Sequence, residues 1–149
     1  GGPSLSELAS LEPLPHARVE LRHAAAEPDR LYGAGLEAYR EGDWKQATTE
    51  FEAALALAQN DWTRRAQAQL YRGSAMLLDG RVDEAVPVLE QAGEARLAPV
   101  RERARWHLAQ AHLLLDDAGG AERALQELAA SPVFGERARG LLERLQAQR

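Results

Sequence analysis

The fold of this chain is decided by one stretch, LYGAGLEAYREGDW at residues 31–44. It reads as an apolar helix that ends at a turn of glycine, aspartate and an aromatic residue. A second helix follows, with Ala47, Phe51 and Ala54 on one face. The turn recurs, because Gly42, Gly80 and Gly119 are spaced 38 and 39 residues apart. A period of this length indicates a helical solenoid, since one helix pair cannot bury its own apolar face.

Two further copies of the pattern keep the same spacing. The second copy carries Gly73, Gly80, Ala85, Leu89 and Ala92, and the third carries Leu108, Ala111, Gly119, Ala124 and Leu128. These repeats resemble tetratricopeptide repeats (TPRs), in which small residues let paired helices approach and larger residues fill the space between them. The resemblance covers about residues 28–131 and implies an all-α, right-handed helical solenoid. The pattern departs from the family at Gln69, Arg72 and His112, and its period exceeds the usual length of about 34 residues.

The sequence predicts three helix pairs, a C-terminal capping helix and an extended N-terminal arm. The repeats are expected at about residues 28–61, 62–97 and 98–131, within a TPR-like domain of residues 27–149. The amphipathic residues 132–148 are expected to close the open end of the solenoid. Residues 1–26 precede the domain, and their prolines favour an extended arm or linker. The first residues resemble a scar left by a tag, and the alternative for the arm is a tail without fixed structure.

The first helix of each pair supplies an apolar surface. In TPR proteins these helices line the concave face, and the resemblance implies that partners contact Tyr32, Leu36, Tyr39, Leu70, Leu77, Trp106 and Leu113. Monomers rarely leave so large an apolar patch bare. We expect it to be covered by a partner helix or strand, by a second copy of the chain, or by the chain's own residues 13–22. The other interpretation is that several of these seven residues form the core between repeats.

Composition excludes several functions. The chain has 149 residues, a net charge of −5 and no cysteine, so disulfides, cysteine-based zinc sites and thiol catalysis are excluded. The acidic charge argues against nucleic-acid binding, even though arginines cluster at residues 101–105. No apolar run is long enough to span a membrane. His107 and His112 are five residues apart and point to different sides of a helix, so no metal site is predicted. Because no catalytic or cofactor motif appears, the chain is predicted to be non-enzymatic and free of cofactors.

A second resemblance concerns the order of the parts. An extended arm, a Gly-Asp-aromatic repeat, repeats of about 38 residues and a capping helix resemble the extracytoplasmic TPR region of bacterial zinc-finger, anti-sigma-factor-like membrane proteins. The zinc-finger motif itself is not in this chain. This resemblance implies an extracytoplasmic sensor or interaction domain, and it favours a periplasmic over a cytoplasmic location. The main prediction is a non-catalytic protein–protein interaction scaffold that binds a peptide or partner helix in an apolar concave groove. The sensor domain and a self-association module are the alternatives.

Overall fold

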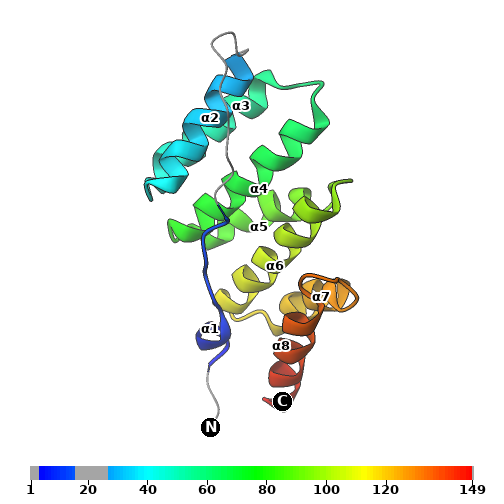
Figure 1. Cartoon of the computed structure of the whole chain (residues 1–149). Coiled ribbons are helices and arrows are strands. Elements are labelled where there is room, and N and C mark those ends of the chain that lie inside the picture. Colours follow the sequence, from blue (N-terminus) through cyan, green and yellow to red (C-terminus); the bar gives the residue numbers. More distant parts are fainter. Residues whose placement is uncertain (1–3, 16–26, 149) are drawn as a thin grey trace.

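The computed structural model describes residues 4–15 and 27–148, and these residues form eight helices and no strand. A short helix comes first, and seven longer helices follow in three antiparallel pairs and a final single helix (Figure 1). Their bounds are α1 (Leu5–Leu8), α2 (Glu27–Arg40), α3 (Trp44–Leu57), α4 (Trp62–Leu78), α5 (Val82–Ala92), α6 (Ala98–Leu114), α7 (Ala118–Leu128) and α8 (Gly135–Ala147). Each helix from α2 to α8 packs against the next one along the chain. The predicted all-α, TPR-like fold is confirmed.

Glycines set the distance between the helices of the first two pairs. A Cβ atom added to Gly35 would lie 2.6 Å from Cε1 of Phe51, and one added to Gly73 would lie 2.7 Å from Cδ2 of Leu89. Both Phe51 and Leu89 are fully buried. The large residue of the second helix therefore occupies the space that a side chain on the first helix would need, as the repeat pattern predicts.

The third pair keeps this arrangement with alanine as the small residue. Ala109 and Leu125 lie seven residues before and nine residues after the turn residue Asp116, as Gly73 and Leu89 do around Gly80, and both are fully buried.

The sequence-based alignment placed His112 at the position of the two earlier glycines, which is wrong by three residues. His112 lies about one turn further along α6 and packs against Gly120 on α7: a Cβ on Gly120 would lie 2.5 Å from Nδ1 of His112. That Nδ1 lies 3.1 Å from Oδ2 of Asp117. Asp117 also caps α7, because its Oδ1 accepts a hydrogen bond from the Gly120 N–H (2.9 Å). This backbone hydrogen bond, helped by His112, lowers the pKa of the Asp117 carboxyl. His112 is thus a packing residue whose bulk is matched by a glycine.

The turns within the pairs use two solutions. Gly42 and Gly80 have φ angles of 79° and 82°, in the left-handed region where glycine is not strained. In the third turn Asp116 adopts the left-handed conformation (φ 59°), and Gly119 lies inside α7. Aspartate tolerates the left-handed region better than most residues. The prediction that Gly119 is the third turn glycine was therefore wrong, because the equivalent turn residue is Asp116, three residues earlier.

The capping helix begins later than its sequence suggests. The Ser131 hydroxyl accepts hydrogen bonds from the N–H groups of Val133 (3.2 Å) and Phe134 (3.1 Å), which holds a turn ahead of α8. From Gly135 onward, α8 buries Ala138, Leu141 and Leu145 against the last pair. Its other face is charged and exposed. The helix therefore covers the apolar end of the solenoid.

Candidate partner-binding face

The N-terminal residues lie across the first helices of the three pairs. We call the surface formed by α2, α4 and α6 the A-helix face, and residues 4–15 the arm. The arm begins with α1 beside α6, and its remaining residues run without helical structure toward α4 and α2 (Figure 1). Of the segment expected to cover the apolar surface, residues 13–15 lie on this face, and residues 16–22 fall outside the described residues.

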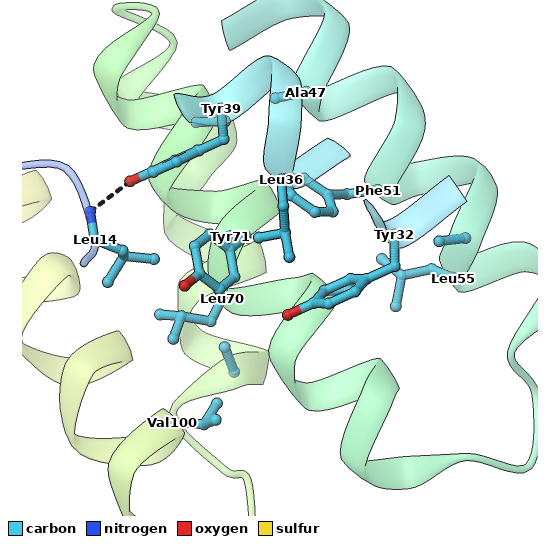
Figure 2. Packing of buried hydrophobic residues seen from close by; sticks show 14 of the residues in the cluster. Leu14, Tyr32, Leu36, Tyr39, Ala47, Phe51, Leu55, Leu70, Tyr71 and Val100 are labelled. Atoms are coloured by element: carbon cyan, nitrogen blue, oxygen red, sulfur yellow. Dashed lines mark hydrogen bonds between the residues drawn. The ribbon is translucent and has the colours of Figure 1, made fainter. Parts of the chain in front are cut away.

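Two tyrosines hold the main chain of the arm at its C-terminal end, and Figure 2 shows the first of these contacts, between Leu14 and Tyr39. The hydroxyl of Tyr39 accepts a hydrogen bond from the Leu14 N–H (2.7 Å) and shares another with the hydroxyl of Ser74 (2.7 Å). The hydroxyl of Tyr71 donates to the carbonyl oxygen of Pro15 (3.1 Å). Burial raises the pKa of both tyrosines, so both hydroxyls are protonated at neutral pH. The pair grips backbone atoms, which every polypeptide carries.

A glutamine holds the other end of the arm. Oε1 of Gln110, on α6, accepts a hydrogen bond from the Ser10 N–H at 2.7 Å. The Gln110 residue is only 1% exposed, and its Nε2 is a buried donor without a hydrogen-bond partner among the described residues. A buried donor that stays unpaired costs about 1–3 kcal/mol. The carboxamide therefore has a hydrogen bond left to give, which the arm does not take.

One side chain of the arm is anchored. Leu14 is 6% exposed and belongs to the same apolar cluster as Tyr39, Leu70 and Tyr71, whose side chains surround it in Figure 2. Burying a leucine side chain contributes about 1.5–3 kcal/mol. Leu11, three residues earlier, is 39% exposed. The space that Leu14 fills, called here the leucine slot, is therefore the main side-chain contact of the non-helical part of the arm.

Beside the arm, a pocket of about 240 Å³ combines an apolar wall with cationic groups. Trp106 stacks on Phe134 with ring centroids 5.8 Å apart, and the guanidinium of Arg137 lies 4.4 Å from the Trp106 ring centroid. Arg103 lines the same pocket and makes no ion pair with any residue of the described ranges. Burial, with the charge of Arg103 adding to it, lowers the pKa of His107 to about 4. His107 is neutral at pH 7, so the charge of this wall comes from the arginines.

All of the residues predicted to contact a partner are buried in this conformation. Tyr39 binds the arm and Trp106 lines the pocket beside it. The others pack inside the apolar clusters, with at most 8% exposure: Tyr32, Leu36, Leu70, Leu77 and Leu113. The first three share the cluster that holds Leu14, whereas Leu77 and Leu113 lie in the cores of the second and third pairs. The arm and the neighbouring helices together cover the seven residues that the sequence analysis treated as one apolar strip.

Three polar residues of this face escaped the sequence analysis, which sought apolar contacts: Tyr71, Ser74 and Gln110. A signal for two of them exists in the repeats. Ser74 lies six residues before the turn residue Gly80, and Gln110 lies six residues before the turn residue Asp116. A hydrogen-bonding side chain thus recurs at the same repeat position on α4 and α6.

Among the described residues, no helix is long and apolar enough to cross a membrane. In the same ranges, no group of three or more metal-ligating side chains is arranged to hold an ion.

Solved structures that are similar to this chain include those of the chaperones PcrH and SycD. PcrH in complex with the chaperone binding region of PopD superposes with a TM-score of 0.70 at 26% identity, covering 86% of this chain and 98% of that one. PcrH from Pseudomonas aeruginosa gives 0.67 at 26% identity, covering 83% and 96%. The type III secretion translocator chaperone SycD of Yersinia enterocolitica, in an alternative dimer, gives 0.61 at 22% identity, covering 85% and 98%. No protein-family model and no curated protein sequence matches the chain.

These likenesses decide between the sequence-based expectations. They confirm a TPR-like scaffold for protein interaction. They give no support to the anti-sigma-factor-like resemblance or to the sensor domain that it implied. The preference for a periplasmic location was wrong, because the similar translocator chaperones are cytoplasmic proteins. That preference followed only from the order of the parts.

Proposed function

We propose that this chain is a non-catalytic, chaperone-like scaffold that holds an extended segment of a partner protein on the A-helix face. One observation carries the proposal: residues 9–15 of the arm, which are not helical, are already held there by main-chain hydrogen bonds to α2, α4 and α6. The likeness to PcrH supports it, because PcrH has been solved with the chaperone binding regions of PopD and of PopB. A face that grips one extended polypeptide by its backbone is suited to grip another.

In this proposal the residues divide into contacts and support. Tyr39, Tyr71 and Gln110 bind the main chain of the partner segment, and Trp106 forms an apolar wall beside it. The buried residues Tyr32, Leu36 and Leu70 form the floor of the leucine slot. Leu77 and Leu113 act indirectly, by fixing the helices that carry the contacts. This assignment predicts that substitutions at Leu77 or Leu113 unfold the chain before they alter any binding preference.

Cysteine protection tests the location of binding, since the chain has no cysteine of its own. Peptides that bind the wild-type chain would first be selected from a random library displayed on phage. Single cysteines would then be placed at Arg137, beside the pocket, and at Gln126, exposed on α7. We expect a selected peptide to slow maleimide labelling at position 137 and to leave position 126 unchanged. Protection at position 126 alone, or a library with no binder, would contradict the proposal.

Self-association is a second candidate because of one exposed apolar pair. Leu57 and Trp62 flank the connection between α3 and α4 and are 53% and 52% exposed. Such a pair is small for a stable dimer interface, which buries about 800 Å² on each partner. Light scattering of the wild-type chain and of Trp62→Glu would settle this candidate. A dimer that Trp62→Glu converts to a monomer would establish it, and a monomer in both cases would remove it.

A further inference from the structure

We infer that the arm is the resident ligand of the A-helix face, and that a partner segment binds there by replacing it. The inference rests on the proposed function and adds two things to it. The partner segment competes with residues 4–15 for the A-helix face, and the face selects a partner segment of defined chemistry. That segment is extended, places an aliphatic side chain in the leucine slot, and carries an acidic residue shortly before it.

Competition follows from the geometry of the slot and the clamps. Leu14 is 6% exposed, so no second side chain fits beside it. The Tyr39 hydroxyl is engaged by the Leu14 N–H and by Ser74. The Tyr71 hydroxyl has one proton to donate, and Pro15 accepts it. A second segment can use these groups only after the arm has left them.

The arm is an incomplete ligand, which leaves room for a better one. It accepts no hydrogen bond from the buried Nε2 of Gln110. Glu12 lines the same pocket as Arg103 and Arg137 but makes no ion pair with either, and about 240 Å³ between the arm and α6 and α8 stays open. A segment that offers a carbonyl oxygen to Gln110 and a carboxylate to the arginines would satisfy groups that the arm leaves unpaired.

The backbone contacts fix the rest of the ligand's pattern. The residue in the leucine slot must carry an N–H group for Tyr39, and so must the residue four positions earlier, where Ser10 donates to Gln110. Proline is therefore excluded at both positions. Prolines on either side of the slot residue are compatible, because Pro13 and Pro15 occupy those positions in the arm and only a carbonyl oxygen is used there.

Because the arm is tethered, its local concentration is in the range of about 1 mM, as for other short linkers. The apparent affinity of a partner falls by the fraction of molecules in which the face is free. Releasing the arm should therefore tighten binding without any change in the face itself.

The experiment uses full-length chains and a fluorescein-labelled peptide of residues 4–15, SLSELASLEPLP, with binding followed by fluorescence anisotropy. Leu14→Asp releases the arm, and Leu11→Asp is the matched control at an exposed leucine of the same arm. We expect the peptide to bind Leu14→Asp at least about tenfold more tightly than it binds the wild type or Leu11→Asp. A peptide with its own Leu14→Asp change should not bind. Glu12→Gln in the peptide should change its affinity less than about twofold, because Glu12 makes no ion pair with Arg103 or Arg137. In the library-selected peptides, glutamine in place of the acidic residue before the slot residue should weaken binding about two- to fivefold, and this loss should vanish in the Arg103→Ala chain.

Equal affinity of the peptide for all three chains would overturn the inference. So would absence of binding to Leu14→Asp when its circular dichroism matches that of the wild type. If Leu14→Asp fails to fold, Leu14→Ala replaces it and must give the same ranking. The library-selected peptides distinguish failure of the competition from failure of the proposed function. If they bind wild type and Leu14→Asp equally, competition fails and the proposed function stands; if no peptide binds any chain, both fail.

Discussion

The contact between α2 and α3 allows a quantitative prediction for Gly35→Ala. The new Cβ would lie between 2.6 and 2.9 Å from three ring carbons of Phe51, whereas carbon atoms in contact settle about 3.5–4.0 Å apart. The Phe51 ring cannot move aside easily, because the rings of Tyr32 and Tyr71 each lie 5.8 Å from it. The two helices must therefore separate. Such overpacking costs about 1–3 kcal/mol, and the higher helix propensity of alanine returns about 1 kcal/mol. The net expectation is a loss of up to about 2 kcal/mol in the free energy of unfolding.

Gly140→Ala is the matched control. Gly140 lies in α8, and a Cβ there would meet nothing within 4 Å, so only the propensity term remains. We expect a gain of about 0.5–1 kcal/mol. Urea unfolding followed by circular dichroism at 222 nm measures both variants. In thermal melts, 1 kcal/mol corresponds to about 2–4 °C for a domain of this size. A midpoint that rises equally in both variants would refute the reasoning that Gly35 is required by the approach of Phe51.

Three further predictions follow from single side chains. Leu14→Ala should destabilise the docked arm by about 2–3 kcal/mol and raise the rate of hydrogen exchange at the amide of residue 14. Leu11→Ala should leave the exchange rate at that amide unchanged. Equal exchange rates in the two variants would contradict the role of the leucine slot. For His107, the pKa falls from its ordinary value of 6.5 to about 4, so the unfolded state binds more protons between these values. The free energy of unfolding should be intact above pH 6.5 and should drop by about 2 kcal/mol at pH 5. His107→Gln should flatten this part of the pH profile. An unchanged slope would show that His107 is not the group responsible. Asp117→Ala removes the cap of α7 and should cost about 1 kcal/mol in urea unfolding at pH 7, and a wild-type midpoint would mean that the hydrogen bond to Gly120 contributes nothing.

The repeats were readable from the sequence because each one solves the same local packing problem. Gly35 faces Phe51 and Gly73 faces Leu89 at the same separation along the chain, so a fixed spacing reveals both contacts. The third pair was harder to read, because its turn residue Asp116 follows Gly80 by 36 residues, whereas Gly80 follows Gly42 by 38, so Ala109 and Leu125 take the places of Gly73 and Leu89. The pattern also misplaced the third turn, because Asp116 adopts the left-handed conformation that glycine supplies in the other two.

The candidate site was less readable, because it joins a non-repeating segment to three different helices. Its hydrogen bonds connect residues 25, 56 and 100 positions apart, and no periodicity encodes such separations. Apolar character correctly pointed to the first helices of the pairs. It could not tell a residue at the surface of the strip, such as Trp106, from one beneath it, such as Leu113, because burial there depends on where the arm lies.

The central claim is that the A-helix face binds an extended segment in the manner of the arm. Photo-crosslinking tests it most directly. A peptide of residues 4–15 with photoleucine in place of Leu14 would be irradiated with the full-length Leu14→Asp chain, and the crosslinked residues would be located by mass spectrometry. The account predicts crosslinks within α2 and α4, around Tyr39 and Tyr71. Crosslinks confined to α3, α5 or α7 would contradict it.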